Sequence, residues 1–124
     1  MDLVFVYGTL KKGRGNHGLL RDAEYIGQFS TIDNKWGLIE LGAFPGMIPA
    51  DNNVVGEVYR VSKEALASLD RLEGTDHGMY ARVGITVRAL DQRQRIKVLD
   101  VWAYQYMIGV SPIWNARHDT VSEW

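Results

Sequence analysis

The first apolar run of the chain is Val4–Tyr7, and it ends at Gly8. Valine and aromatic residues favour strands, and Gly8 and Gly13 lie too close to the run to leave room for a helical face. The run therefore predicts a buried strand near the start of the fold. The loop that follows this strand is rich in glycine and in basic residues.

Clusters of β-branched and aromatic residues, bounded by turn residues, predict further strands. They cover residues 23–31, 36–41, 54–59, 80–89 and 96–106. Asp33 and Asn34 favour a turn, so we expect strand 36–41 to form a hairpin with strand 23–31. The Pro-Gly pair at Pro45 and Gly46 is expected to interrupt the strands over residues 42–46. The polar residues 91–95 are expected to form the tip of a second hairpin.

Two segments predict helices. Residues 16–22 can form a short helix with Asn16 as its N-cap. A longer helix begins after the N-cap Ser62 and stops at Gly74, the residue type usual just beyond a helix end. Its apolar stripe consists of Ala65, Leu66, Leu69 and Leu72. Six strands with one or two packed helices predict an α+β fold, compatible with a small, mixed, mostly antiparallel β-barrel.

Glu73 is the unusual residue of this longer helix. At about 100° per residue it falls inside the apolar stripe, between Leu69 and Leu66. Burial and the partial negative charge at the helix C-terminus would both raise the pKa of its carboxyl group. Glu73 is therefore a candidate acid/base group, unless the last turn frays or an arginine pairs with it. Asp70, at the margin of the stripe, is expected to be solvated.

Composition narrows the class of protein. With 124 residues, 46% of them hydrophobic and 23% charged, the chain is expected to form one domain, with a core at 2–106 and a tail at 107–124 attached by its tryptophans. The formal charge of −1 suggests no nucleic-acid or membrane partner. The chain has no cysteine, which excludes thiol chemistry. With no apolar segment of about 20 residues and no targeting sequence, a cytoplasmic protein is expected.

The loop after Tyr7 offers flexible main-chain N–H groups beside the cations Lys11, Lys12 and Arg14. Such a loop can bind an anion or a carbonyl group. Its G-x-x-x-x-G frame resembles a phosphate-binding loop, but Arg14 and Gly15 stand where that motif requires Lys and Ser or Thr. A nucleotide site is therefore disfavoured. A simple glycine exit from the strand, with solvated lysines, stays open as an interpretation.

No metal or other cofactor is expected. The three histidines are isolated from one another, without the spacing of metal ligands. No serine lies in the G-x-S-x-G motif of the commonest serine hydrolases. The remaining candidates are the loop after Tyr7, the carboxylate of Glu73, and aromatic residues such as Tyr80 and Tyr104, although tyrosines in strands are more often packing residues.

Four motifs carry a resemblance to a known family. They are VFVYGTLKKG at residues 4–13 with Asn16-His17 after it, GEVY at 56–59, LDRLE at 69–73 and YAR at 80–82. In order and spacing they resemble the γ-glutamyl cyclotransferase superfamily, and most of all its small γ-glutamylamine cyclotransferase branch. The resemblance covers about residues 2–106. The sequence departs from the family's pattern mainly over residues 31–53 and beyond Tyr106.

The resemblance implies a compact fold around a small β-barrel and an enzyme that cyclises a γ-glutamyl group to 5-oxoproline, releasing the attached amine. It implies a substrate-binding cradle formed by Tyr7, Gly8, Thr9 and Leu10. It also implies that Glu73 acts as general base and then acid, and that Pro45 and Tyr104 line the pocket. Tyr80, the first residue of the YAR motif, completes the set of expected site residues.

Two classes of function stay open. One is a cofactor-free cyclotransferase acting on a small γ-glutamyl compound, since a single carboxylate can serve both proton transfers. The substrate can be a γ-glutamyl amine, a γ-glutamyl amino acid, glutathione or a γ-glutamylated biosynthetic intermediate. The other is a binding or regulatory module that keeps the γ-glutamyl pocket without turnover. The sequence does not indicate the oligomeric state.

Overall fold

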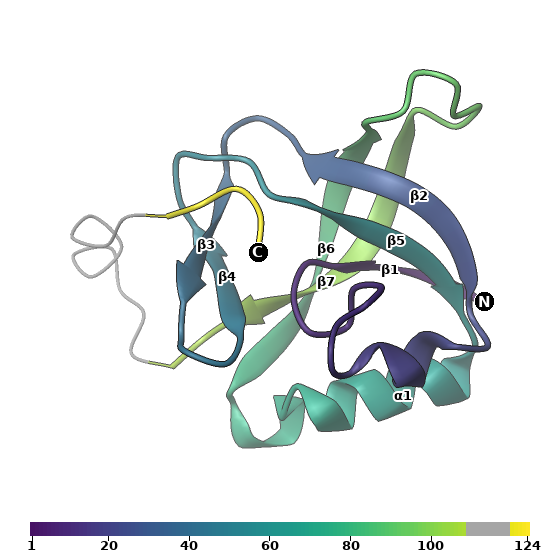
Figure 1. Ribbon diagram of the computed structural model, residues 1–124. Helices are drawn as coiled ribbons and strands as arrows, with labels where there is room; N and C mark the ends of the chain where they lie inside the picture. Colours follow the sequence, from purple (N-terminus) through teal and green to yellow (C-terminus); the bar gives the residue numbers. More distant parts are fainter. Residues whose placement is uncertain (109–119) are drawn as a thin grey trace.

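The computed structural model describes residues 1–108 and 120–124, and within them seven strands form one sheet. The strands are β1 (Asp2–Val6), β2 (Glu24–Thr31), β3 (Trp36–Glu40), β4 (Pro45–Pro49), β5 (Val55–Val61), β6 (Tyr80–Ala89) and β7 (Val98–Tyr106). The helical elements are the 3-10 turns η1 (His17–Leu20) and η2 (Thr75–His77) and the α-helix α1 (Lys63–Leu72). Figure 1 shows their arrangement.

Five of these strands close into a barrel. Their order is β1-β5-β2-β6-β7, and β7 pairs back onto β1 through Val4 and Trp102. The pairings within the barrel are antiparallel except for β1 with β7. β4 extends the sheet beyond β7, and β3 pairs with β4. The predicted mixed, mostly antiparallel α+β barrel is confirmed.

Strand β1 is buried on both faces, which explains its uninterrupted apolar sequence. Phe5 belongs to the cluster that includes alternate residues of all five barrel strands and so fills the barrel interior. Val4 and Val6 belong to a second cluster, together with Leu66 and Leu69 of α1. Because β1 contacts both clusters, the segment that follows it is attached to a rigid support.

Helix α1 covers the outer face of the barrel, beside the segment that contains η1 (Figure 1). Ser62 caps it as expected, since its hydroxyl accepts a hydrogen bond of 3.1 Å from the main-chain N–H of Ala65. Gly74 follows the helix with φ of 65°, a left-handed conformation that glycine adopts without strain. Among the described residues, no helix has the length and apolar character needed to cross a bilayer.

The predicted hairpin between residues 23–31 and 36–41 is wrong. β3 pairs with β4, whereas β2 pairs with β5 and β6. The turn at Asp33 and Asn34 does form, with both residues at positive φ, but it leads the chain away from β2. The interruption expected over residues 42–46 is also wrong in part, because β4 begins at Pro45. Its prolines stand at the two ends of the strand, where a missing N–H is tolerated.

Three smaller expectations also need correction. Residues 16–22 form only the 3-10 turn η1, and Asn16 does not cap it. The side chain of Asn16 instead donates to the Thr9 hydroxyl at 2.8 Å. The strand expected from residue 96 begins at Val98. Of the tail tryptophans, Trp124 packs against the barrel cluster, whereas Trp114 lies outside the described residues.

Candidate functional site

A cavity of about 280 Å³ opens where β1 ends, next to the end of α1. Its size is near the lower end of the range for small-molecule sites, about 300 Å³. The residues around it come from β1 and the loop after it, the segment before β4, the end of α1, and β6 and β7. They are Phe5, Val6, Tyr7, Gly8, Thr9, Leu10, Asn16, Ala43, Phe44, Pro45, Leu72, Glu73, Met79, Tyr80 and Tyr104.

The structure brings all eight site residues expected from the sequence to this one cavity. They are Tyr7, Gly8, Thr9, Leu10, Pro45, Glu73, Tyr80 and Tyr104. These residues are up to 97 positions apart in the chain, yet the barrel closure and the packing of α1 bring them together. Their roles in chemistry stay predictions, because their position alone does not establish a reaction.

Glu73 is the residue directly after α1, and its side chain lines the cavity. The Glu73 N–H still donates to the Leu69 carbonyl oxygen at 2.9 Å, so the last turn is closed and does not fray. Burial raises the pKa of the Glu73 carboxyl group to about 7. A carboxyl group with that pKa can both accept and release a proton near neutral pH.

Three residues of the loop after Tyr7, namely Gly8, Thr9 and Leu10, line the same cavity. None of the described residues accepts a hydrogen bond from the N–H groups of Gly8, Thr9 or Leu10. Gly8 also lies against Pro45 so closely that a Cβ atom at position 8 would stand 2.8 Å from Cδ of Pro45. The absence of a side chain at Gly8 therefore lets the two walls of the cavity approach each other.

Two buried tyrosines, Tyr7 and Tyr80, join the strands around the cavity. The Tyr7 hydroxyl donates to the main-chain oxygen of Tyr104 at 2.6 Å and accepts from the N–H of Met47 at 3.2 Å. The Tyr80 hydroxyl donates to the carbonyl oxygen of Pro45 at 3.0 Å. Burial is the main cause that raises the pKa of both hydroxyl groups. The next contributions come from the charges of Tyr80 and then Glu73 for Tyr7, and from the charge of Glu73 for Tyr80. These hydroxyl groups therefore remain neutral and serve mainly to hold β1, β4, β6 and β7 together.

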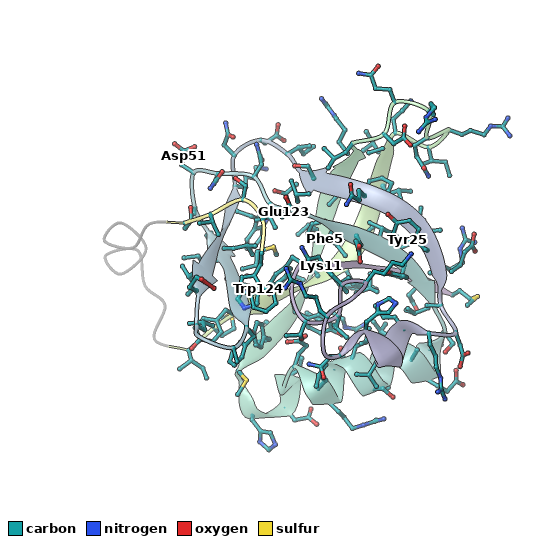
Figure 2. The ribbon with its side chains drawn as sticks, in the orientation of Figure 1. Phe5, Lys11, Tyr25, Asp51, Glu123 and Trp124 are labelled. Carbon is teal, nitrogen blue, oxygen red and sulfur yellow. The ribbon has the colours of Figure 1, made fainter. Side chains whose placement is uncertain are left out.

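The cations of the loop do not line the cavity, contrary to the expectation of a cationic anion site. Nζ of Lys11 and Nη2 of Arg14 donate to the main-chain oxygen of Trp124 at 2.9 and 2.8 Å. Figure 2 shows Lys11 and Trp124 next to each other. The Lys12 N–H donates to the buried carboxylate of Glu57 at 2.9 Å. Two cations thus bind a distant part of the chain, and the alternative of solvated lysines is wrong for Lys11, which is buried.

The sequence suggested that Asp70 is solvated, but its side chain is only 26% exposed and bonds to two neighbouring strands. The Tyr104 hydroxyl donates to its Oδ1 at 2.6 Å, and Nε of Arg82 lies 3.3 Å from the same oxygen. Leu72, which was expected in the buried stripe, is 40% exposed and borders the cavity.

Sequence reasoning missed the apolar mouth of the cavity, formed by Phe44, Leu72 and Met79. These side chains are partly exposed, and they come from the segment before β4, from α1 and from the turn before β6. No local pattern connects them. The one available signal was Leu72, whose position next to Glu73 places it at the same helix end.

A larger and more open hollow, of about 870 Å³, lies elsewhere, between the turn from β2 to β3 and strands β6 and β7. Its charged lining groups include Asp2, Asp33, Lys35 and Asp100. The smaller cavity combines a partly buried carboxyl group of raised pKa with main-chain N–H groups that have no acceptor among the described residues, so it is the better candidate site. No group of three or more potential metal ligands occurs among the described residues.

Comparison with a solved structure agrees with this fold. The crystal structure of an AIG2-like protein from Mus musculus matches with a TM-score of 0.84 and 27% identity. The match covers 100% of this chain and 88% of that one. The likeness therefore includes the barrel, α1 and the segments that surround the cavity.

Sequence relatives point to the same family. A relative from Vibrio cholerae is 48% identical over 71 residues, which are 57% of this chain and 61% of that protein. The Escherichia coli K12 gamma-glutamylcyclotransferase family protein YtfP is 46% identical over 79 residues, 64% of this chain and 67% of that one. Each alignment thus spans only part of the relative. A family model described as gamma-glutamyl cyclotransferase, AIG2-like, matches residues 4–123, and the chain belongs to that family.

Proposed function

We propose that the protein converts the γ-glutamyl group of a small γ-glutamyl amide to 5-oxoproline and releases the attached amine. One observation carries the proposal: the partly buried carboxyl group of Glu73 lines the same small cavity as Gly8, Thr9 and Leu10, whose N–H groups have no acceptor among the described residues. Family membership supports cyclotransferase activity in general. The product and the role of each residue belong to the proposal.

In this reaction the α-amino nitrogen of the substrate attacks its own γ-carbonyl carbon. The new N–C bond closes a five-membered ring, and the bond from that carbon to the leaving nitrogen breaks. Glu73 removes a proton from the α-amino group and then gives it to the leaving nitrogen, so the carboxylate is regenerated. Nucleophile and electrophile belong to one molecule, so the protein needs to fold and hold the substrate, and to transfer the proton.

The N–H groups of Gly8, Thr9 and Leu10 supply the electrostatic part of catalysis. They can bind the α-carboxylate or the oxygen on which negative charge develops during attack. A donor aimed at such an oxygen contributes about 3 kcal/mol to catalysis. The small size of the cavity favours a bent substrate, in which the α-amino group lies close to the γ-carbonyl carbon.

The direct test is to incubate the protein with a panel of γ-glutamyl amines, γ-glutamyl amino acids and glutathione and to measure 5-oxoproline. We expect product from at least one member and a loss of kcat of about 100-fold or more in Glu73→Gln. Glu64→Gln, on the exposed first turn of the same helix, serves as the control and should retain activity. Tight binding without conversion would instead identify a binding module, and full activity of Glu73→Gln would contradict the role of Glu73.

A further inference from the structure

Asp70 makes a set of contacts that the proposed reaction does not use. Its Oδ1 accepts the Tyr104 hydroxyl of β7 at 2.6 Å and lies 3.3 Å from Nε of Arg82 on β6. The guanidinium of Arg82 in turn lies over the indole ring of Trp102, 4.7 Å from its centroid. One carboxylate on α1 is thus bonded to two neighbouring barrel strands.

These bonds fall where the apolar anchoring of α1 ends. Leu69 is completely buried, whereas Arg71 and Leu72, the last two residues of the helix, are exposed. Beyond Leu69, the side chain of Asp70 therefore provides the attachment of the final turn to the barrel. Its main-chain oxygen also accepts the Thr75 hydroxyl at 3.2 Å, which ties the following turn to the same point.

Glu73 follows Asp70 by three residues, and the main chain between them is helical. The Glu73 N–H donates to Leu69 at 2.9 Å and the Gly74 N–H donates to Arg71 at 3.1 Å. A shift or rotation of the turn at Asp70 therefore moves the Glu73 side chain with it. The position of Glu73 relative to the loop after Tyr7 depends on whether this turn is held.

We propose that Asp70 is a positioning residue, which, through Tyr104 and Arg82, holds the last turn of α1 so that Glu73 faces the N–H groups after Tyr7. Its effect on catalysis rests on the proposed function, but its effect on the location of Glu73 does not. A distance error of about 1 Å between reacting groups can reduce a rate about 100-fold. Loosening this turn should therefore impair turnover even though the substrate-binding loop is unaltered.

The kinetic test compares Asp70→Ala, Asp70→Asn and Tyr104→Phe. Asp70→Ala should lower kcat about 10- to 100-fold with little change in KM, because the N–H groups that bind substrate stay in place. Asp70→Asn keeps an oxygen that can accept the Tyr104 hydroxyl, so it should lose less. The double variant Asp70→Ala/Tyr104→Phe should be no slower than the slower single variant, because both substitutions remove the same hydrogen bond, the one between Tyr104 and Asp70.

Asp76→Ala is the matched control. Asp76 is an exposed aspartate three residues after Glu73, at the same separation as Asp70 but on the other side. It should retain kcat and KM. Equal losses of kcat in Asp70→Ala and Asp76→Ala would overturn the positioning role. A loss of kcat in the double variant that equals the product of the two single-variant losses would also overturn it.

A second measurement needs no substrate and separates this inference from the proposed reaction. The titration of the Glu73 carboxyl carbon, followed by NMR, should give a lower pKa in Asp70→Ala than in Asp70→Asn, because both variants remove the same negative charge but only Asp70→Ala releases the turn and exposes Glu73 to water. Among the described residues, the charge of Glu73 acts on three ionisable groups: Tyr7 directly after β1, Tyr80 on β6 and Tyr104 on β7. All three remain protonated in this pH range. Equal Glu73 pKa values in folded Asp70→Ala and Asp70→Asn would overturn the inference even if the enzyme were active.

Discussion

At the scale of single residues, the ionised Glu73 carboxyl group lowers the free energy of unfolding by an amount that depends on pH. Burial raises its pKa from 4.5 to about 7, so the folded protein holds this proton more tightly than the unfolded chain. The free energy of unfolding therefore falls as the pH rises from 4.5 to about 7, and the loss is complete above that range. Such a pKa difference corresponds to about 3 kcal/mol at most.

Glu73→Gln keeps the size of the side chain and removes its charge. We expect the variant to be more stable than the parent protein by about 1–3 kcal/mol at pH 8 and nearly equal at pH 4. Urea unfolding at the two pH values measures the difference. Glu64→Gln, at an exposed position, should show no such change with pH. Equal effects of Glu73→Gln at both pH values would contradict the burial of the charge.

Gly8 provides a second test at the residue scale. A Cβ atom at position 8 would lie 2.8 Å from Cδ and 2.9 Å from Cγ of Pro45, and the Pro45 carbonyl is held by Tyr80. Gly8→Ala should therefore displace the wall of the cavity, raise KM for the substrate and cost about 1–3 kcal/mol of stability. Gly15→Ala, in the same loop but with open space around it, should behave as the parent protein. Substrate titration and thermal unfolding test both variants.

At the scale of elements, residues 120–124 connect two segments that flank the cavity. Lys11 and Arg14, in the loop after β1, donate to the main-chain oxygen of Trp124. Nε1 of Trp124 donates to the carboxylate of Glu40, at the end of β3, at 2.8 Å. Arg14 also lies 4.9 Å from the centroid of the Trp124 ring. Trp124 thus fixes the loop after β1 relative to the segment before β4.

Trp124→Ala should therefore loosen the substrate-binding loop. We expect KM to rise more than kcat falls, and stability to drop by about 1–3 kcal/mol from the lost burial and cation–π contact. Trp124→Phe keeps an aromatic ring but loses the hydrogen bond to Glu40, so its KM and its stability should lie between those of the parent protein and of Trp124→Ala. Val121→Ala, an exposed side chain in the same segment, is the control. A loss of kcat with unchanged KM would contradict this assignment.

The sequence predicted elements best where the signal was local. Helix α1 could be placed because Ser62, the apolar spacing and Gly74 are all within one segment. β4 could not, because Pro45 and Gly46 favour a turn in isolation and form a strand only against β3 and β7. For the same reason the partner of β3 was assigned wrongly: strand pairing depends on contacts far along the chain.

At the scale of the whole molecule, more of the candidate site than of the strand topology could be predicted from the sequence. Six of the eight expected residues lie in the motifs at residues 4–13, 69–73 and 80–82, whereas Pro45 and Tyr104 do not. All eight line the cavity. The contacts that hold these residues in place could not be predicted from the sequence. Asp70 meets Tyr104 and Arg82 only after the barrel has closed, and Lys11 meets Trp124 only because residues 120–124 return to the loop. Such contacts have no signature in spacing.

The mouth of the cavity is also a product of the whole fold, and it bears on the leaving group. Phe44, Leu72 and Met79, from three separate elements, place apolar surface there. Among the described residues that line the cavity, no lysine, arginine or histidine is present to pair with a carboxylate. A leaving group that carries a carboxylate would lose hydration at the mouth without gaining a partner, and would lie near ionised Glu73.

We therefore expect kcat/KM to be at least about tenfold higher for γ-glutamylbutylamine than for γ-glutamylglycine, a difference of about 1.4 kcal/mol. Phe44→Lys should narrow this preference by supplying a cation at the mouth, whereas Phe44→Leu should preserve it. The γ-glutamyl part is identical in the two substrates, so their ratio reports on the leaving group alone. Equal kcat/KM for the two substrates, or an unchanged ratio in Phe44→Lys, would mean that groups other than these three side chains select the amine.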